Sequence, residues 1–393
     1  MCIIKPRPCP VCNNQSKTLI YEQKFANIQN VTFLKGYDVV VCNVCGAGFA
    51  DNIPSQLDFE RYYENMSKYE KIDTDDVAFR HLPVYDERFA RIKKYLTPNL
   101  KILDLGCATG EFLKVLKEYG FNNVKGIDPS INCVEYMKNV YGIDAEHSVI
   151  SRINTKEKFD MVIMTGVVEH LIDFNEFLAV VSQIINDDGV LYLELPDGSG
   201  FSRSYDTPFQ QFSIEHINYF SIIALQNSLC KYGLMLDEYS ITNTNEMGGD
   251  VITPYINAAF RKKRTTSAVI NKDYETTKDL IEYVRKSKEL HNKVNEIFVD
   301  LAESQEPIIV WGVGTHTLRF LEQGDLGKCN IIAFVDSNPH YFGGEYNGVR
   351  VLQPQELIGY KNRILISSMG FQAAIKNVIR EELNLCNDLI LLY

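Results

Sequence analysis

Two pairs of cysteines near the start of the chain have the spacing of a metal site. Cys9 and Cys12 form one CxxC motif, Cys42 and Cys45 form a second, and 29 residues separate the two. Turn-forming residues follow each pair, as in a knuckle whose backbone amides point at a thiolate. Four thiolates bind zinc tetrahedrally and leave no open position for substrate. The motif therefore predicts one structural zinc that helps a small domain to fold, with unrelated buried cysteine pairs or a redox motif as alternatives.

A glycine-rich turn between a short apolar strand and a helix is the second chemical feature. The strand covers residues 101–105, and the turn is Gly-Cys-Ala-Thr-Gly at 106–110. The first glycine lets the backbone approach a ligand closely, and the last packs at the start of the helix. The turn lacks the GxGxxG spacing that cradles the pyrophosphate of a dinucleotide.

Two carboxylates beside this turn indicate its ligand. Asp128 ends the next strand, 24 residues after Asp104, and a carboxylate there accepts both ribose hydroxyls of an adenosine. Asp104 would repel a pyrophosphate but can orient the cationic amino-acid end of S-adenosylmethionine. Methyl transfer therefore fits better than hydride transfer from NAD, and a nucleotide-free Rossmann-like domain is the alternative. The predicted cofactor-binding residues are Asp104, Gly106, Cys107, Ala108, Gly110, Asp128 and Thr165.

At these residues the sequence resembles the class I S-adenosylmethionine-dependent methyltransferases, over about residues 80–200. Apolar strands at 101–105, 124–127, 159–165 and 189–195 alternate with helical segments. This alternation predicts an α/β fold with a parallel, doubly wound sheet.

Two histidines lie downstream of the predicted donor turn. Glu215-His216 is flanked by aromatic residues after the strand at 189–195, which predicts an imidazole in a partly dry pocket that serves as a general base near neutral pH. His170 follows the strand at 159–165, in the segment that lines the donor pocket in the methyltransferases it resembles. It could bind or polarise an acceptor oxygen, or be a structural histidine satisfied by a loop carbonyl.

The composition shifts after about residue 255. Residues 261–295 are charged and are predicted to be helical, and a new strand at 307–311 enters a second glycine-rich turn that contains Gly312 and Gly314. Amides at the start of the following helix could hold a diphosphate, and Asp336 at the end of the next strand could meet a sugar hydroxyl. Tight-turn packing explains a lone Gly-x-Gly about equally well, and the third glycine of an NAD site is missing.

The order of these parts resembles one family, the zinc-binding C-methyltransferases of nucleotide-activated deoxysugars. The resemblance implies a zinc domain at 1–55, a methyl-donor domain at 56–260 and a smaller Rossmann-like domain that helps to hold the nucleotide sugar at 261–393. It covers nearly all of the chain.

The resemblance also implies roles at the acceptor site. The family segment Glu-His-x-x-Tyr-Phe-Ser matches residues 215–221, which makes His216 the base and gives Glu215 a sugar-binding or orienting role. Ser213 stands where the family has a tyrosine, which leaves the substrate and stereochemistry open. The predicted substrate-binding residues are Tyr219, Gly248, Gly249, Gly312, Gly314, Thr315 and Asp336.

The family's remaining catalytic groups match less directly. The family histidine that follows the donor strand corresponds to His170, and Tyr69 is the predicted catalytic tyrosine, with Tyr63 as the alternative. The implied reaction starts when His216 removes a proton beside a 4-keto group. The resulting carbanion equivalent takes the methyl group from S-adenosylmethionine, and zinc takes no chemical part. The alternatives are an O- or N-methyltransferase of a sugar or small metabolite and a non-catalytic zinc-dependent scaffold.

Composition and charge narrow the class of protein. The 393 residues are 45% hydrophobic and 23% charged, which excludes a disordered chain. A net charge of −11 disfavours nucleic-acid binding, and no apolar run approaches the length of a membrane span. The first residues do not resemble a signal peptide. We expect a cytoplasmic enzyme with a small-molecule partner; the oligomeric state is open.

Overall fold

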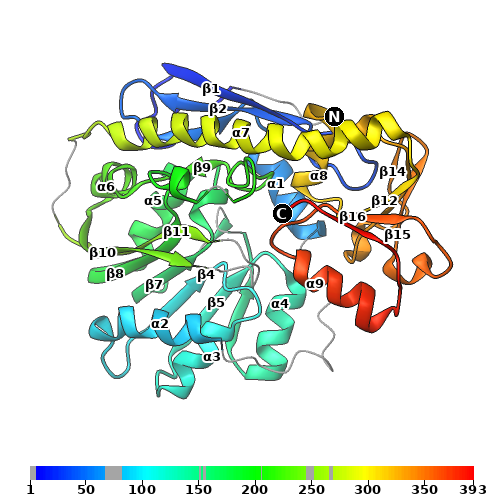
Figure 1. Ribbon diagram of the computed structural model, residues 1–393. Coiled ribbons are helices and arrows are strands. Elements are labelled where there is room, and N and C mark those ends of the chain that lie inside the picture. The colour runs from blue at the N-terminus through cyan, green and yellow to red at the C-terminus, as the bar shows by residue number, and fades with distance from the viewer. Residues whose placement is uncertain are drawn as a thin grey trace.

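The computed structural model describes residues 6–66, 82–149, 152–153, 156–204, 206–244, 252–264 and 269–393. Its strands form sheets of four, seven and six strands. Figure 1 shows the strands β1 and β2 of the first sheet at the top, the second sheet below them, and the third sheet to the right. The long helix α7 (Tyr274–Ser304) runs across the top of the molecule toward the third sheet.

The four-stranded sheet combines the start of the chain with a segment from its middle. Strands β1 (Lys17–Lys24), β2 (Gly36–Cys42) and β3 (Gly48–Asp51) are antiparallel neighbours. Strand β9 (Asn218–Tyr219) pairs with β3 and completes the sheet. The turn between β2 and β3 carries the second CxxC motif, so this motif lies close to the strand that follows Glu215 and His216.

The seven-stranded sheet has the order β10-β11-β8-β7-β4-β5-β6. Its parallel strands are β4 (Ile102–Leu105), β5 (Val124–Asp128), β6 (Asp144–His147), β7 (Phe159–Thr165) and β8 (Ile185–Pro196). Antiparallel β10 (Leu234–Thr244) and β11 (Thr253–Lys262) extend it beyond β8. The chain order reverses between β4 and β7, and ligands bind outside the carboxyl ends of strands at such a point.

Helices flank this sheet and begin at recognisable caps. Ser130 caps α4 (Ile131–Tyr136) and Ser221 caps α6 (Ile222–Leu229), each by accepting a hydrogen bond from a backbone N–H of the first turn. The other helices of this part are α1 (Gln56–Met66), α2 (Pro83–Ile92), α3 (Glu111–Glu118) and α5 (Phe174–Ile184).

The six-stranded sheet has the order β14-β15-β13-β12-β16-β17. Strands β12 (Ile308–Trp311), β13 (Ile331–Val335), β15 (Val349–Leu352), β16 (Arg363–Ile366) and β17 (Leu389–Leu391) are parallel, and β14 (Glu345–Tyr346) is antiparallel. Helix α8 (Thr315–Gln323) follows β12, and α9 (Gln372–Asn377) follows β16.

One hydrophobic core joins parts of the chain that are far apart in sequence. It contains Phe25 beside the first sheet, Phe212 from the loop before β9, Tyr283 from α7 and Phe320 from α8. A second core joins Cys42 and its neighbours to the strands of the seven-stranded sheet. The segment with Glu215 and His216 is therefore held between several packed units. No helix within the described residues has the length and apolar character needed to cross a membrane.

Residues 51–98 contain the end of β3 and the helices α1 and α2 on either side of undescribed residues. The structure differs from the expected elements at the junction after residue 260. The helix expected from residue 261 begins at Tyr274, where Asp273 caps it. Residues 261 and 262 instead end β11, a strand that is almost fully buried because it lies between β8 and β10.

Candidate active site

The glycine-rich turn after β4 forms one wall of a cavity of about 330 Å³, here called the donor cavity. Gly106 has a φ of +75° and lines this cavity. A Cβ atom at Gly106 would lie 2.6 Å from Cγ2 of Val167, so both the backbone conformation and the space require glycine. Gly110 has a φ of +80° and packs against Met137. The turn thus leaves backbone exposed to a ligand.

Asp128 lies at the end of β5 and lines the donor cavity. Its Oδ2 accepts a hydrogen bond of 2.8 Å from the N–H of Ala108, and its Oδ1 accepts one of 2.8 Å from the N–H of Ser130. Burial raises the pKa of Asp128, although these two bonds oppose the rise. Each carboxylate oxygen keeps a second lone pair that can accept a ribose hydroxyl.

Asp104 lies beneath the turn and is 3% exposed. Its Oδ1 is buried and makes no hydrogen bond to any described residue. Burial raises the pKa of this carboxyl to about 7, even though the nearby Arg88 guanidinium opposes the rise. An ammonium group is one partner from which this oxygen can accept a hydrogen bond, although Asp104 itself does not line the donor cavity.

Two histidines and two glutamates meet between the donor cavity and a second cavity. Glu169, His170 and His216 carry ligand-type atoms that all lie within 4.8 Å of one another. The rings of His170 and His216 are edge to face with centroids 5.0 Å apart. The Nδ1 atom of His170 lies 3.1 Å from the carbonyl oxygen of Glu215. The loop after β7 and the segment before β9 are thereby brought into direct contact.

Two tyrosines of α1 face this cluster. The hydroxyl of Tyr63 lies 3.0 Å from Nδ1 of His170, and the hydroxyl of Tyr62 donates a 2.9 Å hydrogen bond to Oε1 of Glu215. Burial holds the pKa of Tyr63 well above its ordinary value, so the phenol stays protonated. The structure therefore places Tyr63, the alternative considered from the sequence, beside His170. Tyr69 lies outside the described residues.

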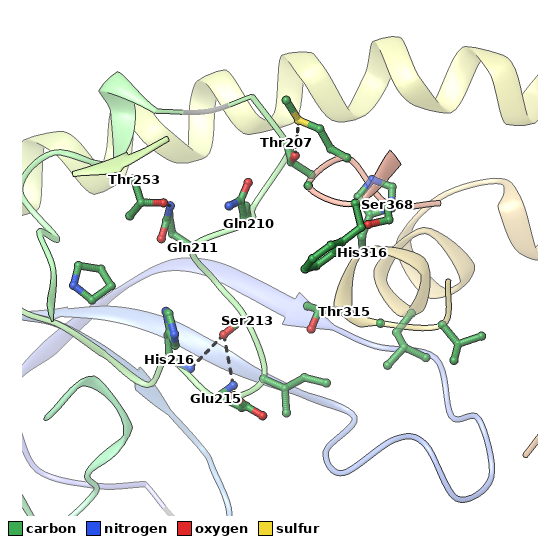
Figure 2. Close-up of a pocket in the computed structure, with 18 of the residues that line it drawn as sticks. Thr207, Gln210, Gln211, Ser213, Glu215, His216, Thr253, Thr315, His316 and Ser368 are labelled. Atoms are coloured by element: carbon green, nitrogen blue, oxygen red, sulfur yellow. Dashed lines mark hydrogen bonds between the residues drawn. The ribbon is translucent and has the colours of Figure 1, made fainter. Parts of the chain in front are cut away.

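The second cavity, here called the acceptor cavity, has a volume of about 360 Å³. Figure 2 shows its polar side chains, which come from the segment before β9, from Thr253 at the start of β11 and, on the opposite side, from Thr315, His316 and Ser368. His216 lines this cavity and His170 lines the donor cavity, while Glu215 lines both. The two cavities therefore meet at Glu215, with His216 on the acceptor side and His170 on the donor side.

Burial changes the protonation of His216. It lowers the pKa of this imidazole to about 3, and the nearby His170 acts in the same direction. The expectation of a base that titrates near neutral pH is therefore wrong for the ligand-free protein. His216 is neutral at pH 7, which is the state that can accept a proton. The turn that carries it is held by Ser213, whose Oγ accepts hydrogen bonds from the N–H groups of Glu215 and His216 (Figure 2).

The second glycine-rich turn reaches the acceptor cavity through Gly314 and Thr315. Gly312 has a φ of +103° and makes the turn itself. Oδ2 of Asp336 accepts a 2.9 Å hydrogen bond from the N–H of Val313, which fixes the turn on β13. A Cβ atom at Gly314 would meet no atom within 4 Å, so the backbone there is open to a ligand.

Several of the predicted site residues have other surroundings. The side chain of Tyr219 is completely buried in the core, and its hydroxyl donates to that of Tyr37. The thiol of Cys107 is buried against the sulfur of Met137. Thr165 ends β7, next to Gly166, which lines the donor cavity. Gly248 and Gly249 lie outside the described residues.

The four cysteines of the CxxC motifs form one cluster. The sulfur atoms of Cys9 and Cys45 are 3.5 Å apart, as are those of Cys12 and Cys42. A zinc ion with bonds of about 2.3 Å would hold tetrahedral sulfur atoms about 3.8 Å apart. The cluster therefore fits a four-thiolate zinc site with small adjustments.

Comparisons with known proteins match parts of the chain to two families. Residues 78–239 match the family described as Methyltransferase domain. This part of the chain is a methyltransferase domain. The match supports S-adenosylmethionine as the donor, so the predicted class of enzyme is confirmed at the level of this domain. Residues 304–391 match a second family, described as C2185-like, N-terminal.

Similar curated proteins and solved structures cover only part of the chain. The ubiquinone biosynthesis O-methyltransferase of Bartonella quintana (strain Toulouse) is 32% identical over 101 residues, which are 24% of this chain and 40% of the relative. The protein of the same name from Bradyrhizobium diazoefficiens is 30% identical over 97 residues, which are 23% of this chain and 38% of the relative. The chain therefore spans less than half of the length of these curated relatives.

Two solved structures are similar to part of the chain at a low level. An S-adenosylmethionine-dependent methyltransferase from Clostridium acetobutylicum has a TM-score of 0.38 and 16% identity, covering 50% of this chain and 96% of its own. The N-methyltransferase NodS from Bradyrhizobium japonicum, in complex with S-adenosyl-L-homocysteine, has a TM-score of 0.37 and 16% identity. The match covers 49% of this chain and 94% of the NodS chain. At these scores no property of either protein is transferred to this chain.

Proposed function

We propose that this protein transfers a methyl group from S-adenosylmethionine to a carbon atom of a nucleotide-linked ketosugar. The observation that carries the proposal is that the donor and acceptor cavities meet at Glu215, with His170 on one side and His216 on the other. A methyl donor and an acceptor bound in these cavities would approach each other beside two histidines. Such an arrangement brings the reacting atoms together and places a proton acceptor next to them.

The donor side has residues suited to each end of S-adenosylmethionine. When bound, this cofactor supplies an electrophilic methyl group. Asp128 accepts hydrogen bonds from the ribose hydroxyls, and the buried Asp104 attracts the ammonium group. Gly106 allows the backbone to approach the ligand without a side chain in between.

The acceptor cavity is lined mainly by neutral side chains, several of them polar. Its wall includes Gln210, Gln211 and Thr253, whose side chains can bond to hydroxyl groups (Figure 2). None of the described residues that line it is a lysine or an arginine. A diphosphate would therefore bind main-chain N–H groups at the turn of Gly314 and the start of α8, while the sugar reaches His216. This cavity is large enough for more than a monosaccharide.

His216 acts as the base in this proposal. It is neutral in the ligand-free protein and can take a proton from the carbon next to the ketone. The negative charge of Glu215 raises the pKa of His216, so it favours the imidazolium that forms. Burial lowers this pKa and so weakens His216 as a base, and the negative charge of Glu215 offsets part of this loss. The protonated phenol of Tyr63 lies beside His170 and can donate a hydrogen bond toward the reacting groups.

The four-cysteine cluster is assigned to a structural zinc. All four ligands are protein thiolates, so no position is open to a substrate. Two of the four cysteines lie at the turn between β2 and β3, and a bound zinc would stabilise this turn.

A substrate screen tests the proposal. Purified protein is incubated with S-adenosylmethionine and a panel of nucleotide-linked ketosugars, and the products are analysed by mass spectrometry. A mass gain of one methylene group on a ketosugar, together with formation of S-adenosylhomocysteine, is expected. An O-methyl product would favour the second candidate, an O-methyltransferase, which the curated relatives support. Formation of no methylated product from any ketosugar of the panel would contradict the nucleotide-sugar assignment.

A further inference from the structure

A buried asparagine lies between the two histidine-bearing segments. Asn218 is 3% exposed and follows His216 by two positions. Its Nδ2 donates hydrogen bonds of 3.2 Å to the carbonyl of Val168 and 2.7 Å to the carbonyl of Leu171. These carbonyls lie immediately before and after Glu169 and His170. One side-chain amide thus holds both ends of the short helical turn that presents His170.

The acceptor end of the same amide is held by a buried arginine. Nη2 of Arg7 donates a 2.8 Å hydrogen bond to Oδ1 of Asn218 and one of 2.7 Å to the carbonyl of Ile217. Nε of Arg7 donates to the carbonyl of Ala50 in β3, and the guanidinium lies over the ring of Phe49. Arg7 precedes the first cysteine of the four-cysteine cluster by two positions.

Backbone contacts connect the same two segments. The N–H of Ile217 donates a 3.0 Å hydrogen bond to the carbonyl of Glu169, and the N–H of Ala50 donates to the carbonyl of Ile217. His170 contacts the carbonyl of Glu215. Any displacement of the loop after β7 would therefore change the position of His170 relative to His216.

We infer that Asn218 is a positioning residue that sets the relative placement of His170 and His216, and that Arg7 anchors it to the cysteine-bearing sheet. Asn218 lines neither cavity, so it acts through the two histidines. Both ends of its amide are used, and a buried amide that loses its partners is costly. The inference rests on the proposed function for its catalytic consequence, but the geometry it describes is testable without any substrate.

The variant Asn218→Asp keeps the contact with Arg7 but removes the hydrogen bonds to the carbonyls of Val168 and Leu171. It keeps the size of the side chain and an acceptor for Arg7, but it replaces both N–H donors with oxygen that faces two carbonyls. We expect kcat to fall about 10- to 100-fold, as for loss of alignment at a reacting pair, with KM for the acceptor changed less than threefold. The matched control is Asn227→Asp. Asn227 is 1% exposed and bonds to the backbone of Asn271, and it lines neither cavity.

Long-range ¹H–¹⁵N NMR of the histidine rings provides a readout that needs no turnover. The ring nitrogens of His170 and His216 should change their shifts or their tautomer balance in Asn218→Asp and stay as in wild type in Asn227→Asp. Unchanged ring signals in a folded Asn218→Asp protein would overturn the inference, whatever the substrate proves to be. If ring signals change as expected but no ketosugar is methylated, the positioning role stands and the proposed function fails.

The variant Arg7→Lys covers the case in which Asn218→Asp does not fold. A lysine keeps the positive charge, but one ammonium cannot reproduce the fork that reaches Ala50, Ile217 and Asn218. The expected result is the same direction of change in the two ring signals, with kcat reduced about three- to tenfold and the affinity for S-adenosylmethionine unchanged. Wild-type ring signals and wild-type kcat in Arg7→Lys would contradict the anchoring role.

Discussion

Replacing Asp104 with asparagine is expected to weaken the binding of S-adenosylmethionine and to remove its dependence on pH. At pH 8 the wild-type carboxylate is ionised and, in the proposed complex, accepts a hydrogen bond from the ammonium group; a hydrogen bond to a charged group contributes about 1.5–3 kcal/mol. The variant should therefore bind roughly 10- to 100-fold more weakly at this pH. Isothermal titration calorimetry measures this difference directly.

The pH dependence follows from the raised pKa. Burial raises the pKa of Asp104 to about 7 in the ligand-free protein, whereas the bound ammonium favours the ionised form. Below pH 7 the carboxyl must lose a proton before it binds the ligand, so wild-type affinity should be about tenfold lower at pH 6 than at pH 8. Titrations in buffers of different ionisation enthalpy should show release of about one proton per ligand at pH 6. Asp104→Asn should lose this release, apart from any contribution of Asp128.

The thermal stability of the ligand-free protein provides a control, because Asp104→Asn should raise stability although it weakens donor binding. Because the folded pKa lies above the ordinary value of 3.8, the contribution of neutral Asp104 to stability is complete below about pH 4 and is lost as the pH rises through about 7. Ligand-free Asp104→Asn should therefore gain in Tm relative to wild type between pH 6 and pH 8. Equal affinities of wild type and variant at pH 8, or the same pH dependence in both, would refute the assignment of Asp104 to the ammonium group.

Three further predictions concern the donor, the metal and the base. Asp128→Ala should lower the affinity for S-adenosylmethionine by about tenfold or more, because it removes the acceptor for two ribose hydroxyls; calorimetry that shows an unchanged Kd would exclude this role. Metal analysis of freshly purified protein should give about one zinc per chain, and Cys42→Ser should reduce the zinc content and the Tm together; a metal-free wild type of normal stability would contradict the zinc assignment. His216→Asn should reduce turnover by about 10²- to 10⁴-fold with little change in acceptor affinity, as measured by steady-state kinetics, and wild-type turnover in this variant would make His216 a structural residue.

Local patterns in the sequence were sufficient to predict the parallel strands of the seven-stranded sheet and the glycine-rich turn after β4. The apolar strand at 159–165 coincides with β7, and the glycines at 106 and 110 both adopt the left-handed conformation that such a turn requires. Each of these features depends on residues close together in the chain. The four cysteines also proved close together in space, because each CxxC motif fixes two ligands in a single turn.

Contacts between segments that lie far apart in the chain could not be predicted from the sequence. Strand β9 has only two residues and pairs with β3, which lies about 170 positions earlier, and nothing in its composition indicates this partner. Arg7 and Asn218 were missed for the same reason, since an isolated arginine and asparagine have no characteristic spacing. Phe59, Tyr62 and Tyr63 did offer a signal, because aromatic residues at positions i, i+3 and i+4 lie on one face of a helix.

The protonation of His216 could not be read from its neighbours in the chain. The adjacent Glu215 suggested an imidazole that titrates near neutral pH, but burial and His170 from another loop lower its pKa to about 3. Desolvation depends on everything packed around the ring, and most of those groups come from other elements.

Deuterium exchange is the most direct test of the central claim, which is methylation of carbon through removal of a proton beside a ketone. The protein is incubated in D₂O with a nucleotide-linked ketosugar that it binds, without methyl donor, and the hydrogen on the carbon next to the ketone is followed by NMR. We predict exchange of this hydrogen in wild type and its loss in His216→Asn. Absence of exchange in wild type, together with an O-methyl product once the donor is added, would contradict the account.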